Sequence, residues 1–260
     1  MRLMKRILGT VTVLALSVSL LAGCGSTAAS PVSSAASTAA ESTTSSSVVS
    51  ETTSAAADEN VAAAAQLLND LTGSYQELWP VILADEYQQT WLDDCTALVG
   101  EENAEAAFEK LSSMVTSDVY GEDAVKAYAN GGGTYFCGFT NDLATLTFDG
   151  ETSTISGTDK DGNVLFSHTY HYIGMEPVHG LYEFESDDAD SGEFTYFFLA
   201  PDTSAETYHI EFRYGSDAEA LSQYDAGEYA YWVASGISTD CDQTMIDNCI
   251  KLFCTENLAG

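Results

Sequence analysis

Two residues with metal-binding side chains stand two positions apart in a segment that has the composition of a β-strand. The segment 208–214 contains His209 and Glu211, and the apolar residues Ile210 and Phe212 alternate with them. Because residues i and i+2 of a strand point to the same face, we expect His209 and Glu211 to lie side by side. An imidazole nitrogen and a carboxylate oxygen are both ligands for Zn²⁺. The strand therefore predicts part of a metal site.

The same strand also has a simpler interpretation. Arg213 is two positions beyond Glu211, so a regular strand places the guanidinium on the same face as the carboxylate. A Glu–Arg pair on an exposed sheet face is common and contributes little to stability. A cation at this position would also repel a bound metal ion. The residues alone leave a metal site and a surface ion pair as alternatives.

The other histidines are less suited to chelation. His168 and His171 stand three positions apart in the predicted strand 164–173, so in a regular strand they face opposite ways and do not bind one ion together. His168 alternates with aromatic residues and is expected on the core face. His179 lies in a Pro-Val-His-Gly turn and is an additional candidate ligand.

Two kinds of periodicity divide the part of the chain that must position these side chains. Before the glycine run 131–133, apolar residues recur with helical spacing, and after it they alternate with the period of two that is typical of strands. The predicted helices cover 62–71, 103–114, 122–128 and 241–254, and the predicted strands cover 143–148, 152–157, 164–173, 181–185, 193–199 and 208–214. Short strands at this spacing predict an antiparallel β-barrel or a sandwich.

The N-terminus has the layout of an export signal. Three basic residues precede an apolar stretch, 7–20, that is too short to span a bilayer comfortably. The sequence Leu-Ala-Gly-Cys24 that follows is similar to a bacterial lipobox, in which the cysteine receives lipid and becomes the mature N-terminus. We therefore expect residues 1–23 to be a lipoprotein signal peptide, with Cys24 anchoring the protein outside the cytoplasm on the bacterial cell membrane. Cleavage elsewhere, with Cys24 incidental, is the alternative.

A change in composition separates a tether from a folded domain. Residues 24–57 are almost entirely Ser, Thr, Ala and Val and offer little to bury, so we expect a flexible tether. Residues 58–260 hold the aromatic and aliphatic residues of a core and are expected to form one domain.

The chain has 40 Asp and Glu against 8 Lys and Arg. This acidity excludes most nucleic-acid binding, which needs a basic surface, and it attracts cations instead.

The cysteines and the short motifs do not indicate an enzyme. Five cysteines follow Cys24, namely Cys95, Cys137, Cys241, Cys249 and Cys254. Disulfides can form outside the cytoplasm, but an odd number leaves at least one thiol, and the sequence does not assign the pairing. No Cys-x-x-Cys pair supports a zinc ribbon. Gly-x-Ser-x-Gly and His-Glu-x-x-His motifs and phosphate-binding glycine loops are absent, so the sequence predicts no catalytic activity.

Five segments, taken in order, resemble the ZinT (YodA-like) family of exported zinc- and cadmium-binding domains. They are Tyr75-Gln-Glu-Leu-Trp-Pro with Trp91 downstream, the segment 139–148, Gly180-Leu-Tyr-Glu-Phe-Glu, Tyr208-His-Ile-Glu-Phe-Arg-Tyr-Gly and Ala226-Gly-Glu-Tyr-Ala-Tyr-Trp. The resemblance covers about residues 70–256. It implies a lipocalin-like (calycin) antiparallel β-barrel that is preceded by N-terminal helices and closed by a C-terminal helix.

The family binds metal through three histidines, of which this chain retains one. Two of them stand in a His-x-His-x-x-x-Gly strand, which reads here His209-x-Glu211-x-x-x-Gly215, so Glu211 replaces the second histidine. The third stands in an Asp-His-x-x-Ala-Pro-type segment, for which Asp202 is the nearest residue that could serve. The resemblance therefore implies Asp202, His209 and Glu211 as ligands of one Zn²⁺, Cd²⁺ or other divalent ion.

Three functions from different classes are open from these observations, and the last of them is an uncharacterised surface enzyme that uses scattered carboxylates. The first is capture of zinc or a related divalent ion by a lipid-anchored extracytoplasmic protein, and the resemblance alone implies delivery of the ion to a metal ABC importer. The second is a barrel without a metal site, a calycin-like surface module that binds a small apolar ligand or a protein.

Overall fold

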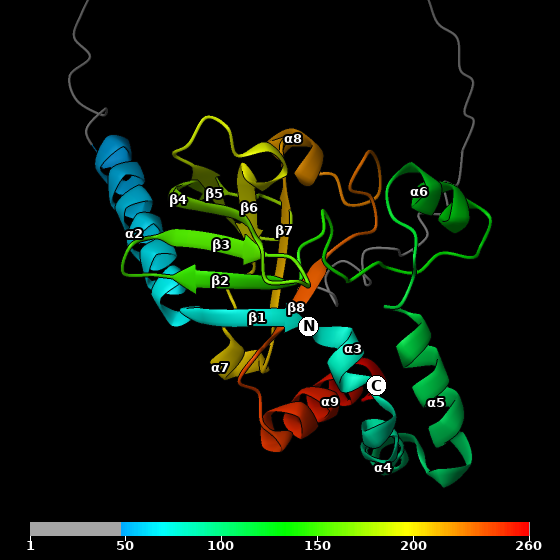
Figure 1. Cartoon of the computed structure of the whole chain (residues 1–260). Coiled ribbons are helices and arrows are strands. Elements are labelled where there is room, and N and C mark those ends of the chain that lie inside the picture. Colours follow the sequence, from blue (N-terminus) through cyan, green and yellow to red (C-terminus); the bar gives the residue numbers. More distant parts are fainter. Residues whose placement is uncertain (1–47, 260) are drawn as a thin grey trace, which may run out of the picture.

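The computed structural model describes residues 48–259, which form a closed antiparallel β-barrel with flanking helices (Figure 1). The eight strands follow one another around the barrel in chain order, and the last pairs with the first. They are β1 (Gly73–Glu77), β2 (Thr145–Asp149), β3 (Thr154–Thr158), β4 (Val164–Met175), β5 (Tyr182–Ser186), β6 (Tyr196–Leu199), β7 (Ile210–Gly215) and β8 (Ala234–Ser238). The barrel prediction is confirmed, and the sandwich alternative is wrong.

Helices cover the barrel on several sides. They are α2 (Val48–Asp70), α3 (Leu78–Ile82), α4 (Gln88–Val99), α5 (Glu101–Ser113), α6 (Glu122–Ala129), α7 (Ser204–Thr207), α8 (Ala218–Leu221) and α9 (Gln243–Leu258), with 3₁₀ turns η1 (Asp85–Tyr87) and η2 (Gly192–Phe194). α2 runs along one side of the barrel, while α3, α4, α5 and α9 gather together beyond another side (Figure 1). The predicted closing helix, 241–254, is present as α9, and Asp242 caps it by accepting the N–H of Met245 at 2.8 Å.

The prediction missed the two strands that close the barrel. β1 and β8 pair antiparallel, with Tyr75 opposite Ser238 and Glu77 opposite Gly236. β8 has the sequence Ala-Ser-Gly-Ile-Ser, which carries a single β-branched apolar residue and no alternation. Its strand conformation therefore depends on its two neighbours, β1 and β7, rather than on its own composition.

Aromatic side chains fill the interior of the barrel. The ring centroid of Phe197, in β6, lies 5.9 Å from that of Phe166 and 5.4 Å from that of Tyr170, both in β4. Because β5 separates β4 from β6 in the sheet, these rings meet across the interior. Tyr214 of β7 stands opposite Phe197 in register, so it also points inwards. The interior is a packed core.

The outer face of β7 is buried as well. Since Tyr214 points into the barrel, the alternation of the strand directs Glu211 and Arg213 outwards. Every residue of β7 is nevertheless buried, because α9 and the segment 221–229 cover this part of the wall. Polar side chains that sequence reasoning places on a sheet surface are thus enclosed between the barrel and its outer layer.

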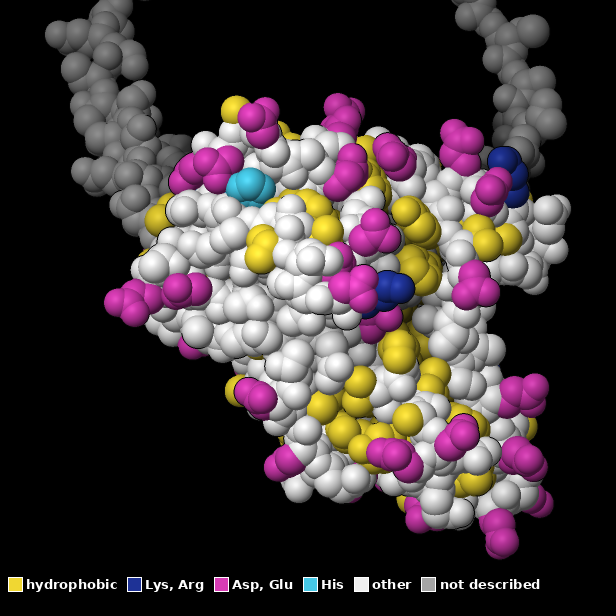
Figure 2. Space-filling model, viewed as in Figure 1, with side chains coloured by type: hydrophobic (Ala, Val, Ile, Leu, Met, Phe, Trp, Pro, Cys, Tyr) yellow, Lys and Arg dark blue, Asp and Glu magenta, His cyan; other side chains and the backbone are white. Residues whose placement is uncertain are grey.

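The predicted signal peptide, 1–23, and the lipid attachment site Cys24 lie outside the described residues, as does most of the predicted tether, 24–57. Helix α2 begins at Val48, earlier than the predicted helix 62–71. In the part of the chain that is described, no helix has both the length and the apolar character needed to cross a membrane. Asp and Glu side chains are scattered over the visible face, as the acidic composition predicts (Figure 2).

Candidate metal centre

A short turn delivers His209 to the start of β7. Thr203 and Glu206 form a capping box around the N-terminus of α7, in which each side chain bonds to a backbone N–H of the other residue. Tyr208 follows with φ +65°, a left-handed conformation that costs a non-glycine residue about 1–2 kcal/mol. The hydroxyl of Thr207 donates to the carbonyl oxygen of His209 at 2.8 Å and holds this turn closed.

One hydrogen bond fixes the orientation and the tautomer of the His209 ring. Nδ1 of His209 lies 2.7 Å from the carbonyl oxygen of Thr207. A carbonyl oxygen only accepts, so Nδ1 carries a proton, and in the neutral imidazole Nε2 carries the lone pair. Metal-binding histidines in proteins are commonly oriented in this way, with the second ring nitrogen donating to a backbone carbonyl. His209 is thus set to bind through Nε2.

Nε2 of His209 faces the carboxylate of Glu211. The distance from Nε2 to Oε1 is 3.7 Å, and both side chains are almost fully buried, with exposed fractions of 1% and 3%. Two ligands that each lie about 2.1 Å from a zinc ion at the tetrahedral angle are about 3.4 Å apart. The two atoms therefore have nearly the spacing of neighbouring ligands of one ion. The prediction that these residues lie side by side is confirmed.

Thiols border the pair without completing a ligand set. Sγ of Cys249, on α9, lies 4.0 Å from Nδ1 of His209, the nitrogen that is already engaged by Thr207. Burial raises the pKa of Cys249 to about 12, and burial likewise raises the pKa of Cys137. Both side chains are neutral thiols at neutral pH in the metal-free protein. They enclose the pair in an apolar environment.

Arg213 does not form the predicted surface pair with Glu211. Its side chain is fully buried, and its guanidinium donates to the carbonyl oxygens of Leu221 and, at 2.5 Å, of Tyr229. The same group lies 4.2 Å from the ring centroid of Tyr224. Among residues 58–259, no ion pair joins it to Glu211. The surface-pair interpretation is therefore wrong, because Arg213 instead holds the segment that covers the outer wall.

Asp202 lies at the entrance to the turn, partly buried, between β6 and α7. In the described residues, no group of three or more His, Cys, Asp or Glu side chains is close enough together to hold a metal ion. The structure thus brings His209 and Glu211 together. Asp202 does not form a three-residue ligand set with them.

His179 belongs to a second buried cluster that sequence reasoning did not identify. Nδ1 of His179 lies 3.4 Å from Oε2 of Glu176, and its ring lies 3.7 Å from that of Tyr224. Burial opposes the charge of Glu176, but hydrogen bonds from His179 and from backbone N–H groups of Val178 and His179 outweigh it, so the pKa of Glu176 is lowered. The sequence Glu-Pro-Val-His is the signal that could have revealed this turn.

The remaining histidines pair with carboxylates of the acidic loop that follows β5. Nδ1 of His168 lies 2.8 Å from Asp188, and Nδ1 of His171 lies 2.7 Å from Asp187. His168 shares the face of Phe166 and Tyr170, as predicted, although it remains partly exposed. Both histidines therefore fasten a loop to β4.

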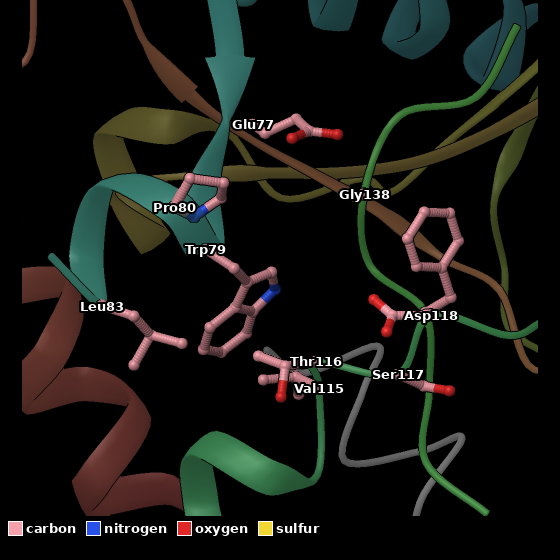
Figure 3. A pocket seen from close by; sticks show the side chains of 10 residues that line it. Glu77, Trp79, Pro80, Leu83, Val115, Thr116, Ser117, Asp118 and Gly138 are labelled. Carbon is pink, nitrogen blue, oxygen red and sulfur yellow. The ribbon is translucent and has the colours of Figure 1, made fainter.

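An open pocket lies outside the barrel, where residues on either side of Cys137 form part of its lining. Its volume is about 300 Å³, at the lower end of the range for small-molecule sites. Its lining is mainly apolar and comes from α3 and from the segments 115–118 and 136–138 (Figure 3). Trp79, Pro80 and Leu83 form one wall, and Glu77 and Asp118 supply carboxylates.

Comparison with known proteins gives structural neighbours but no family. No protein-family model matches the sequence, and no curated protein matches it. Among solved structures, the Zn(II)-bound ZinT-like domain of AdcA from Streptococcus pneumoniae is similar with a TM-score of 0.45 and 16% identity, over 71% of this chain and 89% of that chain. Zn(II)-bound AdcA from the same organism is similar with a TM-score of 0.41 and 18% identity, over 70% of this chain and 34% of that chain. Membership of the ZinT family stays a prediction.

Proposed function

We propose that this chain binds one divalent metal ion, Zn²⁺ or Cd²⁺, through Nε2 of His209 and the carboxylate of Glu211, with Asp202 as the third ligand. The observation that carries the proposal is the buried pair itself. An imidazole whose tautomer is fixed by Thr207 presents Nε2 to a carboxylate at 3.7 Å, close to the spacing of two zinc ligands. One nitrogen and two oxygen donors are a suitable ligand set for zinc.

The register between β6 and β7 supports Asp202 as the third ligand. Leu199 stands opposite Phe212, and the N–H of Ala200 donates to the carbonyl oxygen of Glu211 at 2.9 Å. If the chain continued in this register, Asp202 would stand opposite His209. The loop that carries Asp202 therefore starts directly beside the pair, and a modest movement of this loop on metal binding completes the set.

The cellular setting is also part of the proposal. The predicted export signal at 1–23 and the lipobox ending in Cys24 support a lipid-anchored protein outside the cytoplasm, where the part of the predicted tether before α2, which begins at Val48, would hold the barrel near the membrane. The strong negative charge of the chain favours a high local concentration of cations. Delivery of the ion to a membrane importer would follow from this position, and it rests on the resemblance to the ZinT family.

Zinc titration monitored by isothermal calorimetry tests the metal site. The protein is the full chain with Cys24→Ser, so that no lipid is attached and no thiol is present in the tether. We expect one ion per chain, and we expect His209→Ala combined with Glu211→Ala to weaken binding about 100-fold or more, since loss of an outer-shell partner alone typically costs 10–100-fold. Asp202→Asn should weaken binding separately.

His171→Ala is the matched control, because it removes an imidazole that pairs with Asp187 on the exposed side of β4. Its affinity for zinc should equal that of the parent. Circular dichroism confirms that each variant retains the barrel. Unchanged affinity in the folded double variant would remove the assignment.

The pocket beside α3 favours a second candidate function, binding of a small apolar ligand outside the barrel. Its wall is apolar, with Trp79 as a built-in fluorescent reporter. Binding of a hydrophobic fluorescent probe at one site per chain would support this function. Leu83→Glu should abolish that binding and leave the zinc affinity unchanged. Zinc binding that depends on His209 and Glu211, without saturable probe binding, would favour the metal site.

A further inference from the structure

Two buried thiols meet where helix α4 packs against helix α9. Sγ of Cys95, on α4, lies 3.9 Å from Sγ of Cys254, on α9, and neither side chain is exposed. We propose that these two cysteines are joined by a disulfide bond in the mature protein, which ties α4 to α9. The bond involves no residue of the His209–Glu211 pair.

The backbones around the two sulfur atoms are already held in place. Trp91, one turn before Cys95, donates its indole N–H to the carbonyl oxygen of Ile82 at 2.6 Å. Its ring lies 5.6 Å from that of Phe253, the residue before Cys254. Bond formation closes the S–S distance from 3.9 Å to about 2.05 Å between two helices that are already packed together.

The other described cysteines have different surroundings. Cys249 lies against His209, and Cys137 is enclosed on the outer wall of the barrel near Glu211. Cys241 is partly exposed, just before α9. This arrangement resolves the odd number of cysteines after Cys24, because one pair bonds and three thiols remain.

The oxidant is a protein disulfide or a low-molecular-weight disulfide of the compartment. The thiolate of one cysteine attacks that disulfide, which forms a mixed disulfide and releases one thiol. The second cysteine, as thiolate, then attacks the mixed disulfide, which forms the Cys95–Cys254 bond and releases the second thiol. The two cysteines lose two electrons and two protons in total, and the oxidant gains them as two thiols.

Burial determines when this exchange takes place. Burial raises the pKa of Cys95 and the pKa of Cys254, so neither sulfur is a nucleophilic thiolate in the folded protein. The bond therefore forms during folding, before α9 covers Cys95. Once formed, it is shielded from reductants by the same packing.

A tryptic map after oxidative refolding tests the bond, because Lys and Arg are rare in this chain and separate the cysteines well. The full chain with Cys24→Ser is refolded in a glutathione redox buffer, alkylated with iodoacetamide and digested without reduction. Cleavage places Cys95 in 7–110, Cys137 in 127–160, Cys241 and Cys249 in 214–251, and Cys254 in 252–260. We expect 7–110 linked to 252–260, two hydrogen atoms lighter than their sum. Recovery of 252–260 alkylated, or linked to another peptide, would overturn the proposal.

Thermal unfolding with and without a phosphine reductant gives a second readout. Because the folded protein shields the bond, the reductant is applied in denaturant and kept during refolding; this reduced protein should have a Tm about 5–15 °C below that of the oxidised protein, the range expected for a disulfide in a domain of this size. The same fall is expected in Cys241→Ser, which leaves the pair intact, and no fall in Cys254→Ser. An equal fall in all three proteins would contradict the assignment, and if Cys254→Ser does not fold, the peptide map decides.

Discussion

The carbonyl oxygen of Thr207 accepts the Nδ1–H of His209 at 2.7 Å, and this contact determines that Nε2 is the nitrogen facing Glu211. The contact is local, since the two residues are separated only by Tyr208 in its left-handed conformation. A strained turn and one backbone hydrogen bond thus orient the imidazole before any metal ion arrives. The His209 side chain therefore loses its conformational freedom during folding rather than during metal binding.

Loss of the Thr207 hydroxyl should weaken metal binding without touching a ligand. Thr207→Val keeps the shape of the side chain but removes its hydrogen bond to the carbonyl oxygen of His209. We expect zinc affinity to fall about 10-fold, as for other supporting residues of metal sites, and stability to fall by about 1 kcal/mol. Thr207→Ser retains the hydroxyl and should bind zinc as the parent does. Equal affinities for the Val and Ser variants would show that the Thr207 hydroxyl is not needed to orient His209.

Metal should stabilise the folded barrel, because the unfolded chain does not hold His209 and Glu211 together. At a free zinc concentration about 100 times the Kd, the expected gain is about 2.7 kcal/mol, which raises the Tm by several degrees. Addition of EDTA should reverse the gain. Glu211→Gln keeps the volume of the side chain but removes its charge, so zinc should raise the Tm of this variant far less. A gain in Glu211→Gln equal to that of the parent would place the metal elsewhere.

Arg213 should be one of the most sensitive positions for stability. Arg213→Met fills a similar volume but leaves the carbonyl oxygens of Leu221 and Tyr229 buried without their donor. We expect a loss of about 3 kcal/mol or more in the free energy of unfolding, measured with urea. Lys126→Met is the control, since Lys126 forms an exposed pair with Asp123 and its loss should cost less than about 0.5 kcal/mol. Similar losses in both variants would contradict the structural role of Arg213.

Stability should fall at alkaline pH partly through Tyr128. Its ring stacks on that of Tyr231 with centroids 3.7 Å apart, and burial raises the pKa of Tyr128 to about 12. In the unfolded chain this phenol ionises near pH 10, so between about pH 10 and pH 12 the unfolded state loses a proton that the folded state retains. Stability from this group is thus complete below about pH 10 and is lost as the pH rises towards 12.

Tyr128→Phe cannot ionise and should lose less stability over that range than the parent. Urea unfolding midpoints at about pH 8 and about pH 11 measure the difference. If the two proteins lost the same stability between these values, the phenol of Tyr128 would not contribute to the pH dependence.

Features that depend on short-range periodicity were readable in the sequence. Alternation over 143–148, 164–173 and 208–214 predicted strands that the structure contains, and the i, i+2 spacing predicted the contact between His209 and Glu211. The strand repeat fixes which side chains share a face whatever the rest of the chain does.

Features that depend on contacts between distant parts of the chain were not readable in the sequence. β8 became a strand because β1 and β7 offer it hydrogen bonds, and β1 precedes it by more than 150 residues. A sequence pattern does not show which surface another part of the chain will cover.

The sequence by itself determined that Glu211 lies in a strand and that His209 stands two residues before it, a spacing short enough for the two side chains to meet, although His209 lies in the turn that precedes β7. Only the tertiary structure decided that this pair is enclosed by α9 and that Arg213 turns away to the segment 221–229. It alone decided that Cys95 meets Cys254. Burial and contact between distant segments follow from how the whole chain packs, and packing is a property of all the elements together.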